Sequence, residues 1–109
     1  MTVSYKVLGQ SSPAATTNTD VYTVGSGKQA IISTLSIANR NTSASSYRIA
    51  IRPNGATLSN EHYLAYDVAI AANDTTLLTT ALALDAGDIL TVYALSASIS
   101  FGAYGSEIL

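Results

Sequence analysis

An alternation of apolar and polar side chains with a period of two residues is the feature that most restricts how this chain can fold. Successive side chains of a β-strand point to opposite faces, so this pattern indicates strands with one buried side. Helical periodicity does not recur in the sequence. Residues 46–53 show the alternation most clearly, with apolar Tyr47, Ile49 and Ile51 opposed to Arg48, Ala50 and Arg52.

Turn signals separate the alternating stretches at the spacing of about 8 to 12 residues that is typical of sandwiches and barrels. Glycine supplies positive φ at such turns, and Asn or Asp can bond to the local backbone. These signals are Gly25-Ser26-Gly27, Asn54-Gly55, Ala72-Asn73-Asp74 and Asp85-Ala86-Gly87-Asp88. We expect about eight strands, at residues 4–9, 20–24, 29–39, 46–53, 63–68, 75–80, 89–95 and 98–104.

Two details of these strands follow from the same pattern. In the long strand at 29–39, the alternation predicts an inward row formed by Ile31, Ser33, Leu35 and Ile37. Residues 81–84, Ala-Leu-Ala-Leu, fit either the end of a strand or one helical turn.

Eight short strands with polar turns must bury their apolar sides in two packed sheets. The 109 residues make one domain, and we expect an all-β fold, a single antiparallel β-sandwich of jelly-roll type. Residues 20–109 would form the sandwich, and residues 1–19 an N-terminal strand with an extended arm. The arm has few large apolar groups, so its strand should join a sheet edge in its own subunit or in a neighbour, with exchange into a neighbour favoured.

Composition excludes several classes of partner. Only 11% of residues are charged, the net charge is -2, and the five basic residues form no cluster, so direct binding to nucleic acid is not expected. The longest apolar run, at 68–72, is far too short to span a membrane. The first residues lack the pattern of a secretory signal, so we expect the chain to fold where it is made. No cysteine is present, which excludes disulfides.

Catalytic and metal-binding patterns are also missing. His62 is the only histidine, and without cysteine it would need several carboxylates to hold a transition metal. No nucleophile elbow or glycine-rich phosphate loop occurs. The sequence therefore predicts no enzyme activity, no metal and no cofactor.

Contact with other proteins remains as the function that the composition favours. Seven tyrosines against one phenylalanine and no tryptophan give side chains suited to half-buried positions at a subunit contact. Each could equally be an ordinary strand residue. Tyr63 and Tyr66 differ in parity, so at least one of them should point outward. The candidate interface residues are Tyr5, Arg48, Arg52, His62, Tyr63 and Tyr66.

Over nearly its whole length the chain resembles the small, cysteine-free virion structural proteins of tailed bacteriophages, particularly of phages that infect cyanobacteria and other aquatic bacteria. The matching segments are Tyr5-Lys6-Val7-Leu8-Gly9-Gln10, Tyr22-Thr23-Val24, Lys28-Gln29-Ala30, Ile37-Ala38-Asn39-Arg40, Tyr47-Arg48-Ile49-Ala50-Ile51, Asn60-Glu61-His62-Tyr63-Leu64-Ala65-Tyr66-Asp67, Ala86-Gly87-Asp88 and Phe101-Gly102-Ala103-Tyr104-Gly105-Ser106-Glu107-Ile108.

The resemblance implies a mechanical role without enzymatic motifs. It suggests a capsid cement or decoration protein in the virion, assembled in the host cytoplasm as a homo-oligomer, with a trimer expected, that bridges major capsid subunits. The alternative is a tail, fibre or baseplate module that contacts other tail proteins or host surface glycan. For glycan binding, Asn54, Asn60, His62 and Tyr63 are the candidate residues.

Overall fold

The computed structural model describes residues 1–109 and contains eight antiparallel strands in two sheets. The strands are β1 (Val3–Ser11), β2 (Thr19–Thr23), β3 (Gln29–Asn39), β4 (Ser45–Arg52), β5 (Tyr63–Ile70), β6 (Thr75–Asp85), β7 (Ile89–Ala94) and β8 (Ile99–Ile108). Two short helical turns, η1 (Pro53–Gly55) and η2 (Asn60–His62), interrupt the segment between β4 and β5. No helical segment has the length and apolar character of a membrane span.

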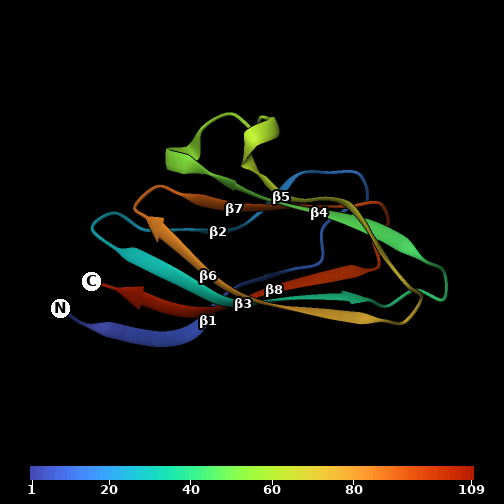
Figure 1. Cartoon of the computed structure of the whole chain (residues 1–109), viewed down its shortest axis with the longest axis horizontal. Helices are drawn as coiled ribbons and strands as arrows, with labels where there is room; N and C mark the ends of the chain where they lie inside the picture. The colour runs from blue at the N-terminus through green and yellow to red at the C-terminus, as the bar shows by residue number, and fades with distance from the viewer.

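The strand order confirms the predicted jelly roll. One sheet has the order β1-β8-β3-β6 and the other β2-β7-β4-β5, as Figure 1 shows in its lower and upper layers. Each strand of the first half pairs with its counterpart of the second half, β1 with β8, β2 with β7, β3 with β6 and β4 with β5. This is the topology of a long hairpin rolled into a sandwich.

The core lies between the sheets and is mainly aliphatic, with one aromatic pair. Ile32, Ile37, Ile49, Leu90 and Ile99 are its largest fully buried side chains. Tyr47 meets Phe101 edge to face across the core, at 6.3 Å between ring centroids. No buried side-chain polar atom lacks a hydrogen-bond partner, so the core is fully satisfied.

The predicted inward row of β3 is correct only in its second half. Leu35 and Ile37 are buried, but at the start of the strand Ile32 is buried and Ile31 is 37% exposed. The reason is a bulge at Ser33, since Ile32 pairs with Gly105 of β8 and Thr34 with the adjacent Tyr104. The extra residue moves the following side chains to the opposite face.

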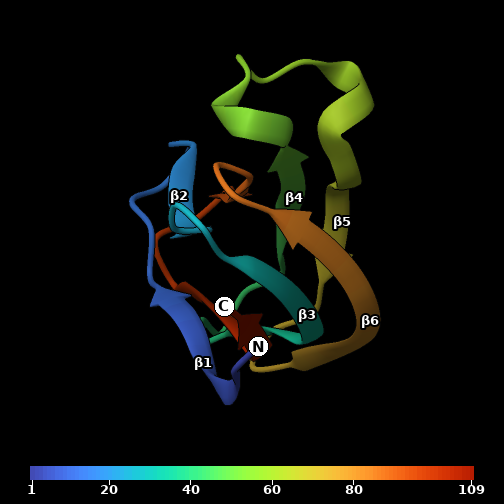
Figure 2. The same ribbon diagram turned by 90° about the vertical axis from the view of Figure 1, so that its left-hand side faces the viewer.

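Residues 81–84 belong to β6, which resolves the choice that the sequence left open. The expected turns also form, with positive φ at Gly27, Asn54, Gly55, Asn73 and Gly87. Figure 2 shows the segment between β4 and β5, in green to yellow, standing away from the rest of the sandwich.

The N-terminal strand joins the sandwich of its own chain. β1 pairs with β8 as the edge strand of its sheet, which is one of the two arrangements that the sequence allowed. The connection after it is also tied down, because Pro13 is buried and the Thr16 amide donates to the Ala94 carbonyl at 2.8 Å.

Candidate functional site

The outer face of the β1-β8-β3-β6 sheet is nearly free of charge. Three charged residues occur in these strands, and register places Lys6 and Glu107 on the side that faces the other sheet. Asp85, at the end of β6, lies on the outer side, and at the other end of the sheet Arg40, which follows β3, binds the Ser100 and Ser12 hydroxyls. We call this outer side the Leu77 face; its exposed large apolar residues are Val3, Tyr5, Val7, Ile31 and Leu77.

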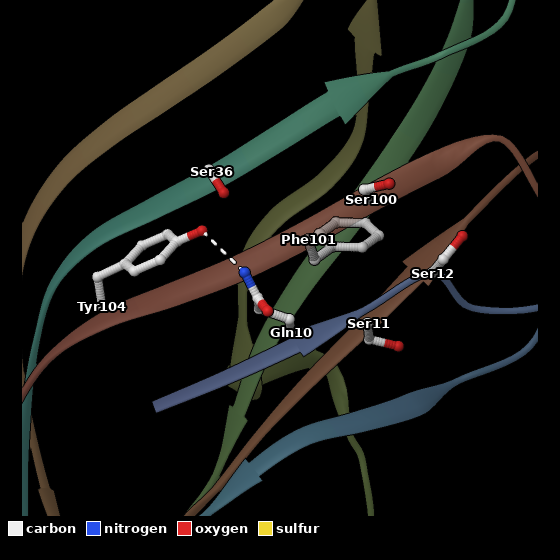
Figure 3. Close-up of a pocket in the computed structure, with 7 residues that line it drawn as sticks. All are labelled: Gln10, Ser11, Ser12, Ser36, Ser100, Phe101 and Tyr104. Carbon is white, nitrogen blue, oxygen red and sulfur yellow. Dashed lines mark hydrogen bonds between the residues drawn. The ribbon is translucent and has the colours of Figure 1, made fainter. Parts of the chain in front are cut away.

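Projections and hollows lie close together on the Leu77 face. Tyr5 is 85% exposed and Leu77 66% exposed, so both stand out from it. A hollow of about 430 Å³ lies beside them, and Figure 3 shows its lining of serine hydroxyls, Gln10, Phe101 and Tyr104. A second hollow of about 310 Å³ lies around Ile31, near the end of the same sheet. Such relief is suited to interlocking with another protein surface.

Glycine at position 102 shapes the larger hollow. A Cβ there would come within 2.5 Å of the Tyr104 hydroxyl and 2.7 Å of the Ser36 hydroxyl, so only glycine lets the tyrosine ring lie across the sheet. The Gln10 side-chain amide donates to the Tyr104 hydroxyl at 3.5 Å. Hydrogen bonding to Ser36 and then to Gln10 lowers the pKa of Tyr104.

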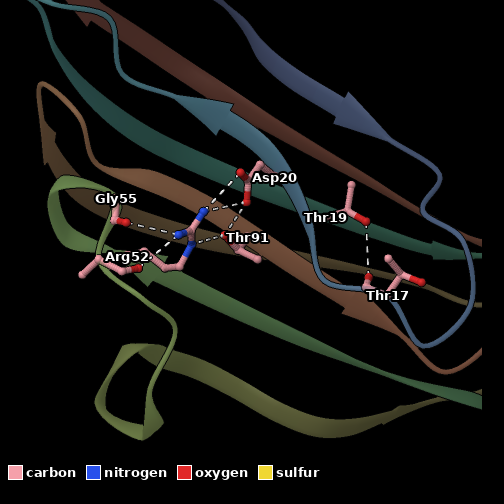
Figure 4. Close-up of polar contacts among 7 residues, drawn as sticks. Thr17, Thr19, Asp20, Arg52, Gly55 and Thr91 are labelled. Carbon is pink, nitrogen blue, oxygen red and sulfur yellow. Dashed lines mark hydrogen bonds and ion pairs between the residues drawn. The ribbon is translucent and has the colours of Figure 1, made fainter.

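The opposite sheet carries the arginines, and its outer side is called the arginine face below. Arg52 of β4 binds both carboxylate oxygens of Asp20 at 3.0 and 3.1 Å and donates to the Thr91 hydroxyl at 3.0 Å. It also reaches the carbonyls of Gly55 and Ala56 in the turn after β4 (Figure 4). One side chain thus ties β2, β4, β7 and η1 together.

Arg48 forms the second cluster on the arginine face. Its guanidinium binds Asp67 at 2.6 and 3.3 Å and lies between two rings, 4.1 Å from the centroid of Tyr66 and 4.2 Å from that of Tyr93. The hydrogen-bonded Asp67 carboxylate raises the pKa of Arg48. Asp67 has a φ of 52°, a left-handed conformation that is uncommon outside glycine. Ion pairing and cation–π contact together hold this strained residue.

A third charged cluster lies between the sheets at the end where both termini lie. Glu107 of β8 accepts from the Tyr22 hydroxyl at 2.6 Å and pairs with Lys6 of β1 at 2.6 Å. The Lys6 ammonium, and then the Tyr22 hydroxyl, hold the pKa of Glu107 below its usual value. Burial, reinforced by Glu107, raises the pKa of Tyr22. The cluster fastens β1 to β8 and to the other sheet.

The six candidate interface residues do not form one surface. Tyr5 lies on the Leu77 face, whereas Arg48, Arg52, Tyr63 and Tyr66 belong to the arginine face. His62 lies in η2, where its Nδ1 accepts from the Ser59 amide at 3.1 Å. Both arginines form ion pairs with carboxylates of their own chain, so neither needs a carboxylate of a neighbouring subunit to balance its charge.

Tyr63 and Tyr66 meet on the same side despite their difference in parity. Their ring centroids are 4.8 Å apart at an interplanar angle of 85°. Register shifts in the β4–β5 pairing account for this, because Tyr47 pairs with Val68, Ile49 with Ala65 and Ala50 with Tyr63. The prediction that at least one ring points outward is confirmed, since Tyr66 is 55% exposed.

Sequence reasoning missed the residue that projects most from the middle of the Leu77 face. Leu77 and Leu78 are neighbours in a strand, so one of the two had to point outward, and this signal was present in the sequence. Only the pairing register shows which one, since Leu78 packs against the core.

No group of three or more His, Asp or Glu side chains is placed to hold a metal ion. In comparisons with known proteins, no family model matches the chain, and neither the curated proteins nor the solved structures contain a match.

Proposed function

We propose that this protein is a non-enzymatic structural component of a bacteriophage virion, a cement or decoration protein that binds the capsid surface as a homo-oligomer, a trimer by resemblance. The Leu77 face is the observation that carries the proposal. A sheet face with exposed Tyr5 and Leu77, and with charged side chains only at its two ends, has the apolar, charge-depleted character of an interface core. The sequence resemblance supports the virion context.

The size of this face is suited to a stable contact. The eleven residues of β3 extend over roughly 37 Å, and four strands cover roughly 19 Å in width, or roughly 700 Å² before side-chain relief is counted. Specific interfaces bury about 800 Å² on each partner. The Leu77 face can therefore supply one complete interface.

Bridging would stabilise a shell in a simple way. Each copy that contacts two capsid subunits adds buried surface, and this surface must separate before the subunits can move apart. Apolar contact is suited to this task because it needs no ligand and is insensitive to the counterions that accompany packaged nucleic acid. Such a function requires no chemistry from the protein.

Leu77→Asp tests the Leu77 face, and Leu95→Asp is the matched control. Both leucines are more than half exposed, but Leu95 lies in the turn between β7 and β8. We expect Leu77→Asp to keep its melting temperature and to lose self-association in light scattering and occupancy on virions, because it places a charge in the contact. Leu95→Asp should behave like the parent. Equal occupancy of the two variants would contradict the proposal.

The copy number in purified virions tests the location independently. Quantitative mass spectrometry should find hundreds of copies if the protein covers the shell. A few to tens of copies would indicate a tail, fibre or baseplate module. Absence from the virion would overturn the structural role altogether.

A further inference from the structure

A small pocket on the arginine face is not explained by the proposed role. Asn60 of η2 and Tyr63 and Tyr66 of β5 line an open hollow of about 250 Å³. The two rings stand nearly perpendicular to each other, at 85°, and line the hollow together with a planar amide. Pockets for small molecules combine apolar faces with a few placed polar groups in this way.

The polar atoms of this pocket are available to a ligand. The Asn60 amide and the hydroxyls of Tyr63 and Tyr66 make no side-chain hydrogen bond within the chain, whereas most other polar side chains of this region do. An amide supplies two donors and an acceptor, and each phenol supplies one donor and an acceptor. The three residues that line the hollow therefore each carry a group that can both donate and accept a hydrogen bond.

The pocket is also held in shape before any ligand arrives. The Ser59 hydroxyl bonds to Glu61 and the Ser59 amide to His62, so the turn that carries Asn60 is closed by its own side chains. Arg48 packs on the Tyr66 ring and is itself fixed by Asp67. A preformed site loses little side-chain entropy on binding.

Charge at the pocket selects against ionic ligands. The Arg48 guanidinium already lies over the Tyr66 ring, and its charge is matched by Asp67, so a second cation on that ring would be repelled. An anion finds no lysine among the lining residues and an arginine that is already paired with Asp67, and the Glu61 carboxylate lies next to Asn60 in the chain. A neutral ligand remains, with C–H surface for the rings and hydroxyls for the amide.

We propose that Asn60, Tyr63 and Tyr66 bind a neutral pyranose. One C–H face of the sugar stacks on a tyrosine ring, whose π face is electron-rich, and ring hydroxyls bond to the Asn60 amide. The site lies on the sheet opposite the Leu77 face, so it stays accessible when that face is covered. This assignment does not depend on the virion role, and either proposal can fail alone.

Saturation-transfer NMR tests the site with the methyl glycosides of glucose, galactose and mannose and with N-acetylglucosamine, at millimolar concentration. We expect transfer to the C–H protons of at least one of these sugars. Tyr66→Leu should weaken its binding roughly tenfold, since a stacking contact is lost. Asn60→Ala should weaken binding several-fold, and it removes no side-chain hydrogen bond within the chain, which keeps the test valid if Tyr66→Leu disturbs Arg48.

Leu64→Ala is the matched control, because Leu64 lies on the same strand, is as exposed as Tyr66 at 55% and does not line the hollow, so this variant should bind as the parent does. Tetramethylammonium and sialic acid serve as the cationic and anionic probes. No transfer to any neutral sugar, equal binding by Asn60→Ala and the parent, or binding of an ionic probe in place of the sugars would each overturn the proposal.

Discussion

Arg52→Ala should destabilise the isolated protein, which would show that this arginine serves the fold. The side chain of Arg52 is only 17% exposed, and it reaches a carboxylate, a hydroxyl and two carbonyls that belong to β2, β7 and the η1 turn. Truncation to alanine removes these contacts together. It also leaves the Asp20 carboxylate without its cation, on a strand of only five residues.

The expected loss in free energy of unfolding follows from the exposure of each partner of Arg52. The Asp20 side chain is 50% exposed, so the ion pair itself contributes about 0.5–1 kcal/mol. The bond to the hydroxyl of Thr91, a residue that is 4% exposed, adds about 1.5 kcal/mol because the donor is charged. The exposed turn carbonyls regain water and add little. The loss is about 2–2.5 kcal/mol, or roughly 8–11 °C in melting temperature for a domain of this size.

Arg40→Ala is the matched control for this measurement. Arg40 donates to Ser12, Ser100 and the Ala97 carbonyl, all of them neutral and exposed contacts. Its removal should cost less than about 1 kcal/mol. Urea or thermal unfolding of both variants, together with a double-mutant cycle of Arg52→Ala and Asp20→Ala, separates the ion pair from the remaining contacts. Equal melting temperatures for Arg52→Ala and the parent, with lower occupancy of the variant on virions, would refute this reasoning. That result would indicate that Arg52 acts in a contact with another protein.

Two further predictions concern the N-terminal strand. Glu107→Gln should lower the free energy of unfolding by about 1–2 kcal/mol at neutral pH. Because the folded pKa of Glu107 lies below its ordinary 4.5, its contribution is present above that value and is lost as pH falls through the folded pKa, so the stabilities of variant and parent should converge in acid. A constant difference between them from pH 7 down to 3 would contradict a stabilising role for the Glu107 cluster. Deletion of residues 1–12 should lower the melting temperature, because β1 belongs to its own sheet, and should reduce the oligomeric mass in light scattering, because Val3, Tyr5 and Val7 of the Leu77 face are lost. A truncated protein with the parent's melting temperature would contradict the pairing of β1 within its own sandwich.

The strands and the sandwich class were predictable because the physical signals for strands and turns are local. The alternation of apolar and polar residues occurs within the sequence of each strand, and the turns at Gly27 and Gly87 use residues that tolerate positive φ. The inward row of β3 was not predictable, since its reversal depends on a bulge against another strand. Gly105 of β8 marks the place, because a Cβ there would overlap the Ile31 carbonyl. A glycine within a strand can signal close backbone approach, but the sequence does not show which strand approaches it.

The candidate site was less predictable for the same physical reason. The tyrosines and arginines could be selected by residue type, but their grouping depends on register. Arg48 and Asp67 are on neighbouring strands, and the shifts in the β4–β5 pairing bring Asp67, Tyr63 and Tyr66 to the side of the arginine. A pattern with strict period two would have separated the two tyrosines.

The low charge of the whole chain has a different meaning once it is located in the fold. Only 11% of residues are charged, and a uniform deficit would leave both faces of the sandwich equally prone to association. Instead, Arg48 and Arg52 with their partners Asp67 and Asp20 lie on one sheet, and within-chain pairing satisfies them before any partner binds. The scarcity of charged side chains is therefore concentrated on the Leu77 face. Asp85 and Arg40 lie at the two ends of this face, so a contact over its centre desolvates no charged side chain, and the free energy that this burial releases is not offset there by the cost of removing water from charges.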